Sequence, residues 1–326
     1  WNSPGAEDFH PKSDAGRWEP ASQSFVLDLA GFNSSTIDAA DPSEPVGQGV
    51  APNGGRANLG SYGDSSEASK TPTLPSGCGM VFNVKQGGAR EFTNLQSAVG
   101  GLPRILDKNA CLILRDTLIY LEQVTVEGFV NNGNRITITK DPSFPPNSMP
   151  TVEAPSNSTA AFRIYNDSVT LSNLRVDFGL SGISYGVQAS SSYVRISSVI
   201  ANGLTSTHEA GITVSSWSTV EYTSVSVQSG HGFLLQGSVG TTLSYSSAAT
   251  AGAAAAALVL GNSSSNTVQS GIFSNPTGYG AYLVNAGYNS ISASTMTSGA
   301  TGVYTLYAVG STSNTVLERR IENTAG

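Results

Sequence analysis

The sequence has little charge, and over almost a third of its length it has none. Between Tyr222 and Leu317 there is no Asp, Glu, Lys or Arg, and His231 and the tyrosines are the only titratable side chains. General acid–base and metal-assisted catalysis usually require paired carboxylates, a lysine, or a carboxylate with a histidine. This stretch lacks the usual catalytic groups, and we expect it to be scaffold.

Other absences exclude further classes of protein. Of the 326 residues, 12% are charged and 39% are hydrophobic, which is unlike the highly charged, apolar-poor composition of disordered chains. There is no basic stripe of the kind that binds nucleic acid. No apolar run reaches the length of a membrane span. We expect a folded protein with no nucleic-acid partner and no membrane span.

Cysteine is also scarce. Cys78 and Cys111 are the only two, and they flank a predicted helix. In an exported protein such a pair is expected to form a disulfide, whereas two buried free thiols are the alternative, which only geometry excludes. The chain begins at Trp1 without a signal peptide, as expected for a processed subunit or one segment of a longer precursor. We predict a disulfide and an extracellular or cell-surface location.

A repeat of short apolar segments is what the sequence does contain. Each unit has a small residue, an apolar triplet, a polar turn and a second apolar pair. The first part recurs at Gly186-Val187, Gly211-Ile212, Gly232-Phe233, Ala257-Leu258, Gly280-Ala281 and Gly302-Val303-Tyr304. The second part recurs at Ile196, Val220, Leu243, Val268, Ile291 and Val316. A fixed spacing of 20-odd residues indicates a solenoid.

The spacing selects one architecture. Propeller blades need about 40–50 residues, and leucine-rich repeats carry a Leu/Asn signature that is missing here. A β-sandwich is the alternative, but the two-residue Asn-Gly or Asp-Gly turns of its hairpins are scarce in the repeats. We predict an all-β protein consisting of a single right-handed parallel β-helix over 78–316, with about 22–25 residues per coil.

Residues 78–103 predict how this helix begins. They read as a strand, a Gly-rich turn and a short amphipathic helix that starts near Phe92-Thr93 and ends at Pro103. Thr93 is the expected N-cap, and Leu95, Val99 and Leu102 are the expected buried residues. The segment resembles the opening of pectin-lyase-like and pectinesterase-like β-helix proteins. The resemblance implies that the short helix closes the first coil.

The N-terminal 70 residues resemble a different part of such proteins. Their motifs are Asp8-Phe9-His10-Pro11-Lys12-Ser13, Gly16-Arg17-Trp18, Ile37-Asp38-Ala39-Ala40-Asp41-Pro42 and Pro52-Asn53-Gly54-Gly55-Arg56-Ala57-Asn58-Leu59-Gly60-Ser61-Tyr62-Gly63. They look like the closing segment of secreted bacterial surface β-helix repeat proteins, which follows the last coil and covers its core. Here that segment (1–70) comes first, followed by a linker (71–77), the β-helix (78–316) and a C-terminal tail (317–326).

This inverted order leads to a structural hypothesis. A last coil without a closing segment exposes strand edges and apolar side chains, and head-to-tail contacts that do not close generate filaments. We expect residues 1–70 of one subunit to complete the open coil of the next copy in an extracellular filament or surface fibre. Two alternatives are one segment of a giant tandem β-helix adhesin, and a carbohydrate-binding or carbohydrate-active surface protein. The expected interface residues are Trp18, Ile37, Leu59 and Tyr62 against Val303, Tyr304, Leu306 and Val316.

No catalytic constellation is evident, and we predict no enzyme and no cofactor. Asp38, Asp41 and Glu44 form an acidic loop, the weak candidate for a Ca²⁺ site, although an ordinary solvated turn is favoured. Sequons at Asn33, Asn157, Asn166 and Asn262 are candidates for glycosylation. Trp18, Trp217 and Tyr279 are aromatic residues that stack on sugars if the protein binds surface glycans, but no aromatic or acidic groove is evident from the sequence.

Overall fold

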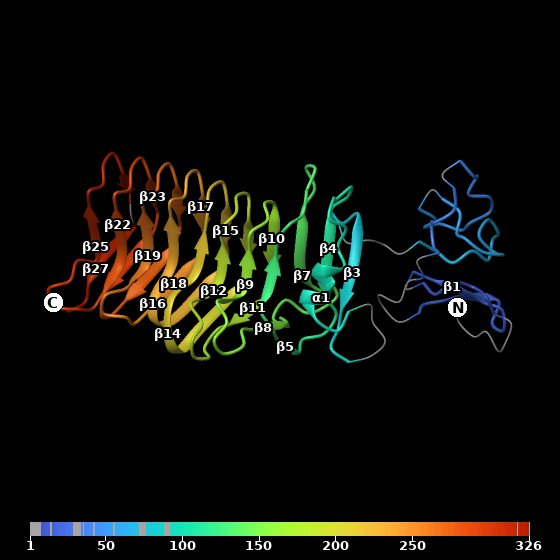
Figure 1. Ribbon diagram of the computed structural model, residues 1–326, viewed down its shortest axis with the longest axis horizontal. Helices are drawn as coiled ribbons and strands as arrows, with labels where there is room; N and C mark the ends of the chain where they lie inside the picture. Colours follow the sequence, from blue (N-terminus) through green and yellow to red (C-terminus); the bar gives the residue numbers. More distant parts are fainter. Residues whose placement is uncertain are drawn as a thin grey trace. The chain divides into compact units, whose positions relative to one another are not determined.

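The chain divides into two compact units, Trp1–Gly77 and Cys78–Gly326. In this computed structural model the described residues are 8–13, 15–28, 34, 36–41, 43–54, 56–71, 76–87, 92–317 and 319–325. The second unit is an all-β solenoid of about 9 turns, almost without helix. The predicted fold class, a single parallel β-helix, is therefore confirmed (Figure 1). No helix among the described residues is long and apolar enough to cross a membrane.

Each coil contributes strands to three rows, and all strand pairs in the rows are parallel. The first row contains β3 (Met80–Val84), β4 (Ala110–Leu114), β7 (Ile136–Lys140), β10 (Val169–Ser172), β13 (Arg195–Ser197), β15 (Thr219–Glu221), β17 (Thr242–Ser244), β20 (Thr267–Gln269), β23 (Ser290–Ser292) and β26 (Thr315–Leu317). The second row contains β5 (Ile119–Leu121), β8 (Thr151–Glu153), β11 (Arg175–Asp177), the first parts of β14 (Ile200–Val214) and β16 (Ser224–Gln236), β18 (Ser247–Thr250), β21 (Ile272–Asn275), β24 (Thr295–Ser298) and β27 (Arg320–Asn323). The third row contains β6 (Val124–Val126), β9 (Ala160–Ile164), β12 (Tyr185–Ala189), the last parts of β14 and β16, β19 (Ala256–Gly261), β22 (Tyr279–Val284) and β25 (Leu306–Val309).

The core is built from aliphatic side chains that stack in register from coil to coil. In the first row Ile196 pairs with Val220, Val220 with Leu243, and Leu243 with Val268, and all four are fully buried. Alternate residues of each strand point outward, which is why Ser, Thr and Gln suffice between them. The second apolar position of the sequence repeat is thus the inward position of the first row.

Coil length agrees with the prediction over most of the solenoid. Side-chain to backbone contacts between successive coils join residues 23, 24 or 25 positions apart. The coil between β7 and β10 is longer, because Ser172 bonds Thr139, which lies 33 positions before it. The extra residues form a loop in which the buried Lys140 ammonium donates to the carbonyls of Pro145 and Pro146 at 2.7 and 3.0 Å.

The last apolar triplet predicted from the repeat was wrong. In the third row Ala281 pairs with Leu306, so the strand is β25, while Gly302-Val303-Tyr304 lies in the preceding loop. The loop is longer in this coil, and it moves the inward position three residues further along the chain. Sequence spacing alone does not distinguish the two registers.

A short helix, α1 (Leu95–Gly100), lies against the first coil and buries Leu95, Ala98 and Val99. Its N-cap is Asn94, not the predicted Thr93, because Asn94 Oδ1 accepts a hydrogen bond from the Ser97 N–H at 2.8 Å. The Glu122 carboxylate accepts the Leu95 and Gln96 N–H groups, each at 2.8 Å. Two orphan donors of the first helical turn are thereby satisfied.

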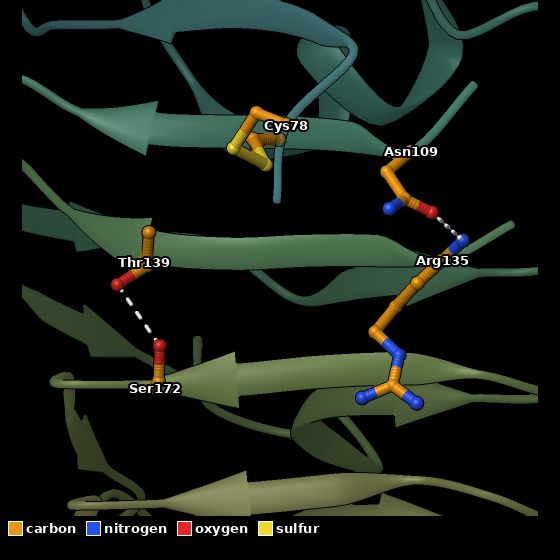
Figure 2. The surroundings of a disulfide bond; sticks show 6 residues. Cys78, Asn109, Arg135, Thr139 and Ser172 are labelled. Carbon is orange, nitrogen blue, oxygen red and sulfur yellow. Dashed lines mark hydrogen bonds between the residues drawn. A yellow bond between two sulfur atoms is a disulfide. The ribbon is translucent and has the colours of Figure 1, made fainter. Parts of the chain in front are cut away.

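The predicted disulfide between Cys78 and Cys111 is present (Figure 2). It ties Cys78, two residues before β3, to β4, which is the neighbour of β3 in the first row. Polar contacts continue the same stack in Figure 2, where Arg135 N–H donates to Asn109 Oδ1 at 2.9 Å. The start of the solenoid is thus closed both by a helix and by a covalent bond.

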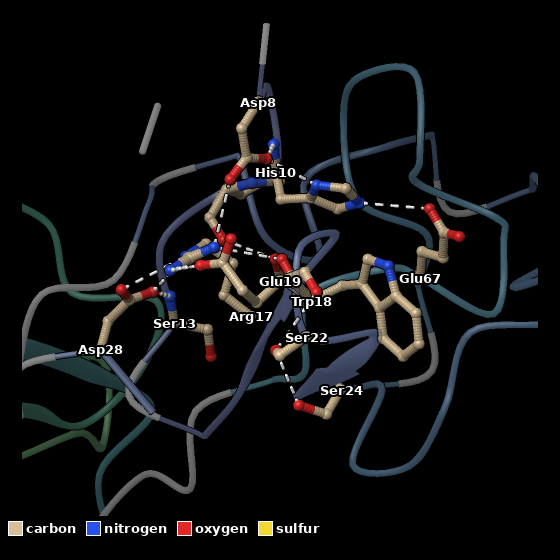
Figure 3. Close-up of polar contacts among 12 residues, drawn as sticks. Asp8, His10, Ser13, Arg17, Trp18, Glu19, Ser22, Ser24, Asp28 and Glu67 are labelled. Carbon is tan, nitrogen blue, oxygen red and sulfur yellow. Dashed lines mark hydrogen bonds and ion pairs between the residues drawn. The ribbon is translucent and has the colours of Figure 1, made fainter. Parts of the chain in front are cut away.

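The N-terminal unit has one antiparallel hairpin, β1 (Arg17–Glu19) with β2 (Ser24–Val26). A cluster of ion pairs surrounds the buried Arg17 guanidinium, which lies 3.2 Å from Asp8, 3.1 Å from Glu19 and 3.3 Å from Asp28 (Figure 3). A buried charge requires such partners, since it has lost its hydration. The Gly-Arg-Trp motif therefore has a structural role that the sequence did not reveal.

Candidate functional site

A groove of about 690 Å³ opens on the outer face of the third row. Strands β12, β14, β16, β19 and β22 pass beneath it. The described residues that line it are Tyr185, His208, Glu209, Ser229, Gly230, His231, Leu234, Gln236, Gly252, Ala253, Ala254, Ala255, Val259, Tyr282 and Val284. Ligand pockets in proteins have volumes of roughly 300–1,000 Å³, and this groove falls within that range.

The sides of the groove arise from strands that continue round a corner of the solenoid. β14 has 15 residues, and its pairing with β16 shifts between Gly203 and Thr207 and again between Thr207 and Ala210. Such bulges bend a strand and redirect its side chains. Further along, the fully buried Asn275 donates from Nδ2 to the carbonyls of Gly252 and Ala255, at 3.0 and 2.9 Å. These contacts hold the alanine-rich loop that borders the groove.

The floor is a row of outward-pointing residues. Strand register places Leu234 beside Val259 and Val259 beside Tyr282. Val259 points outward at the bottom of the groove and is only 4% exposed. The floor of the groove is therefore apolar, which is unusual for the outer face of this Ser- and Thr-rich solenoid.

Tyrosine rings extend the floor toward the last coil. Tyr282 stacks on Tyr279 at 5.4 Å and on Tyr307 at 5.5 Å between ring centroids, and Tyr304 stacks on Tyr307 at 5.5 Å. The planes of these pairs differ by 7° to 20°. Tyr304 is 67% exposed. The stack is an aromatic surface continuous with the groove.

The opposite end of the groove is polar. The Tyr185 hydroxyl donates to the Glu209 carboxylate, and burial together with this hydrogen bond raises the pKa of Tyr185 to about 12. His208 is buried against Phe178, with ring centroids 4.8 Å apart, and its Nδ1 lies 2.8 Å from the Ile183 carbonyl. An N–H at Nδ1 donates to this carbonyl, and Nε2 is buried without a hydrogen-bond partner among the described residues.

His231 presents the complementary group. The Ala256 N–H donates to its Nδ1 at 3.1 Å, so the neutral ring carries its proton on Nε2. Burial lowers the pKa of His231, which keeps the ring uncharged at neutral pH. The polar end of the groove thus combines a buried histidine, a histidine N–H donor and a carboxylate.

The predicted interface residues fall in both units. In the N-terminal unit Leu59 is 49% exposed, whereas Trp18 packs edge-on against Phe25 at 5.4 Å and Tyr62 stacks on His10 at 3.9 Å. Ile37 is half-buried. In the last coil Leu306 and Val316 pack on the core, Val303 is half-buried and Tyr304 is exposed. Their role as an interface stays a prediction.

The glycosylation candidates differ in accessibility. Asn157 and Asn262 are exposed. Asn166 is 6% exposed, and its amide is occupied, since Oδ1 accepts from the Phe129 N–H and Nδ2 donates to Asn131, each at 2.8 Å. Asn166 is therefore unsuited to carry a glycan in the folded protein. Asn33 lies outside the described residues.

The acidic loop does not gather its carboxylates on one point. Asp41 accepts from the Ser43 N–H and hydroxyl at 2.8 and 2.7 Å, and these bonds lower its pKa. Asp38 accepts from the Thr71 hydroxyl at 2.9 Å instead, and burial raises its pKa. The Glu44 N–H donates to the Asp41 carbonyl at 3.0 Å. No group of three or more His, Cys, Asp or Glu suited to a metal ion occurs among the described residues.

The aromatic groove was not anticipated from the sequence. Of the stacked tyrosines only Tyr279 was a candidate for sugar stacking. Trp217, another candidate, lies in a turn, is 56% exposed, and is not among the residues that line the groove. The available signal was the pair Tyr279 and Tyr282 recurring as Tyr304 and Tyr307 one coil later. One coil spacing between identical pairs predicts a vertical stack, provided the register is known.

Fold and groove together describe a parallel β-helix protein with a lateral groove. No family model matches the sequence, and no curated protein matches it. Among solved structures, two crystal structures of the pectin methylesterase from Aspergillus niger, in deglycosylated and penultimately deglycosylated forms, are similar. Each has 13% sequence identity and a TM-score of 0.36, over 75% of this chain and 87% of that chain. The parallel β-helix of this chain rests on its own strand topology, and an overlap of this size says nothing about its family or activity.

Proposed function

We propose that this chain is an extracellular β-helix protein that binds an extended carbohydrate chain in its groove. The observation that carries the proposal is the apolar floor of Leu234, Val259 and Tyr282 beside the hydrogen-bonding groups of Tyr185 and His231. A sugar ring has the matching two-sided chemistry, because its C–H face packs on apolar and aromatic surfaces while its hydroxyl rim donates and accepts hydrogen bonds. The disulfide supports an oxidising, extracellular location.

The dimensions favour a polymer over a small molecule. The groove crosses five coils, from β12 to β22. Four steps between parallel strands span about 19 Å at roughly 4.8 Å each. The tyrosine stack then continues the surface onto the next coil at Tyr307. An open groove of this length suits several consecutive sugar units.

The groove is better suited to binding than to catalysis. Glu209 is the one carboxylate among the described lining residues, and acid–base cleavage of a glycosidic bond uses two. The nearby acidic residues are otherwise engaged, since Glu221 pairs with Arg195 and Asp177 accepts from the Gly179 N–H at 3.0 Å. We therefore propose a non-enzymatic role.

Replacement of Tyr282 tests the proposal. Soluble oligosaccharides and plant, fungal and bacterial polysaccharides would be screened on an array, and the binders measured by calorimetry with the parent protein and Tyr282→Ala. We expect at least a tenfold loss of affinity in the variant. Tyr222→Ala is the matched control, because Tyr222 stacks on Tyr245 in a turn outside the groove. Alanine is accepted at this turn position, since Ala293 has the same φ of 49° in a later coil. Equal affinities for Tyr282→Ala and the parent would place any glycan elsewhere.

A filament subunit is the second candidate, favoured by the last coil. Strands β25, β26 and β27 pair on one side only among the described residues, while the first coil is covered by α1. Val309, Leu317 and Ile321 are 42%, 67% and 41% exposed there. Open strand edges with apolar side chains favour pairing with another chain, and we propose residues 1–70 of a second copy as the partner.

Electron microscopy of the native protein tests this assembly. Unbranched fibres are expected from the parent, and monomers from a variant lacking residues 1–70, in which Cys78–Gly326 retains its own core. Leu317→Asp in the full chain should also prevent fibres, whereas Leu118→Asp, at a residue 50% exposed in an early coil, should not. Fibres that persist without residues 1–70 would rule out this joint.

A further inference from the structure

We infer that the groove selects neutral glycans and rejects polyanionic ones. This inference rests on the proposed carbohydrate binding and names the class of ligand. Among the described lining residues there is no Lys or Arg, and Glu209 is the one carboxylate. A uronate polymer places a carboxylate on each sugar unit, and each carboxylate that enters the groove loses hydration without gaining a cation.

The two histidines do not supply the missing positive charge. His231 accepts the Ala256 N–H at Nδ1, so a proton added there would break this bond, and burial already lowers its pKa. His208 Nε2 is buried, so it presents no group to a ligand in the groove. The Nε2–H of His231 and the Glu209–Tyr185 pair match hydroxyls, which both donate and accept.

The nearest cation on the same row lies one strand before the polar end of the groove, on β9, and is set back from the apolar floor. Arg163 pairs in register with Gln188, Gln188 with Thr213, and Thr213 with Leu234 of the floor. Three strand spacings of roughly 4.8 Å put it about 14 Å from Leu234, beyond one Debye length at physiological salt. Its guanidinium is also held over the Tyr165 ring, 5.0 Å from the centroid, and bonds that hydroxyl.

The far end of the groove contains no charged side chain, because the sequence there has none. Its strands β19 and β22, with the Gly252–Ala255 loop, belong to the stretch between Tyr222 and Leu317 that contains no Asp, Glu, Lys or Arg. Binding there rests on ring stacking and uncharged hydrogen bonds. Such binding is insensitive to salt, whereas recognition of a polyanion is strongly salt-dependent.

A matched pair of ligands tests this inference. Each neutral polysaccharide that binds would be compared with its C6-oxidised uronate form, by calorimetry at pH 7 in 20 and 150 mM salt. We expect at least tenfold weaker binding of the uronate form at low salt, a smaller difference at high salt, and neutral binding that is unchanged by salt. Glu209→Gln should reduce the difference in affinity between the neutral and the uronate form. Gln236→Lys, which adds a cation to the groove, should increase uronate binding, whereas Tyr222→Lys outside the groove should not.

The outcomes separate this inference from the proposed function. Tighter binding of uronate forms by the parent would overturn the selectivity while leaving carbohydrate binding intact. Equal binding of both forms, unaffected by Glu209→Gln and Gln236→Lys, would also overturn it. No binding of any glycan would overturn the proposed function, and the inference with it.

Discussion

Phe178 shows how single glycines shape the groove from below. An added Cβ at Gly203 would lie 2.3 Å from the Phe178 ring, and one at Gly186 would lie 2.7 Å from it. Neither glycine requires a left-handed backbone, so the constraint is steric. Because His208 packs edge-on against the same ring, the two glycines set the position of a groove residue that they do not touch.

Gly203→Ala should therefore displace Phe178 and, with it, His208. Overpacking of a core typically costs about 1–3 kcal/mol, and we expect that loss in the free energy of unfolding by urea, together with weaker glycan binding. Gly287→Ala is the control, because a Cβ there would lie 3.4 Å from the nearest atom and should leave both unchanged. A stable Gly203→Ala protein with normal binding would show that the Phe178 pocket relaxes freely.

His231 gives the groove region a dependence on pH. Its pKa is lowered from 6.5 in the folded protein, so the unfolded chain takes up a proton at a higher pH than the folded one. The contribution of His231 to the free energy of unfolding is then fully present above about pH 6.5. It decreases as the pH falls, by up to about 1.4 kcal/mol for each pH unit. The free energy of unfolding at pH 7.5 and 5.5 should change less in His231→Gln than in the parent. The carboxyls of Glu122 and Asp38, whose pKa values are also shifted, are present in both proteins. Their contributions to the pH dependence therefore cancel in the comparison. Equal changes would exclude His231 as the source.

At the scale of elements, a polar ladder holds the turns after the third row. Ser218, Thr241, Asn266, Asn289 and Asn314 follow one another in successive coils, and each later side chain accepts the backbone N–H of the residue before it, at 2.8 to 3.3 Å. The first four are buried. The ladder satisfies backbone donors that would otherwise be buried without a partner.

Asn289→Ala should break the ladder at its fourth member. Asn289 Oδ1 accepts from both the N–H and the Nδ2 of Asn266 at 3.0 Å, so the variant leaves buried donors unpaired, at a cost of about 1–3 kcal/mol. Gln269→Ala removes an exposed amide from β20 and should change the free energy of unfolding by less than about 0.5 kcal/mol. Equal thermal melting of the two variants would mean that water replaces the lost amide.

The elements were predictable to different degrees, for physical reasons. The first row could be predicted because each coil contributes one inward residue to it. These aliphatic residues, such as Val220 and Leu243, recur at the coil spacing. The α1 cap was misplaced by one residue, since Thr93 and Asn94 are both good N-caps and only the contact with Ser97 distinguishes them. The groove was not predictable, because an outward Val259 and an inward Leu258 look alike until strand register and bordering loops are known.

At the scale of the whole molecule, the solenoid is a stack in which each coil contacts its neighbours, so local changes stay local. The Cys78–Cys111 disulfide closes a loop with a sequence separation of 33. Closure of a loop of this length is worth about 3–4 kcal/mol in the chain-entropy model. That contribution acts on the first two coils.

The double variant Cys78→Ser/Cys111→Ala should lose amide protection in residues 78–140 and keep it in residues 219–298. Hydrogen exchange with mass spectrometry measures both regions in one experiment. Dithiothreitol should reproduce the effect in the parent and have no further effect on the variant. Loss of protection along the entire solenoid would instead show that its coils unfold as a single cooperative unit.

The uncharged run of coils also bears on how the protein is degraded. Between Arg195 and Arg319 there is no Lys or Arg, so a trypsin-like protease finds no cleavage site in that part of the chain even after it unfolds. Acid-specific proteases find none between Glu221 and Leu317. This part of the chain therefore resists both classes of protease by composition as well as by folding, and they must begin to cut outside the coils that carry the tyrosine stack.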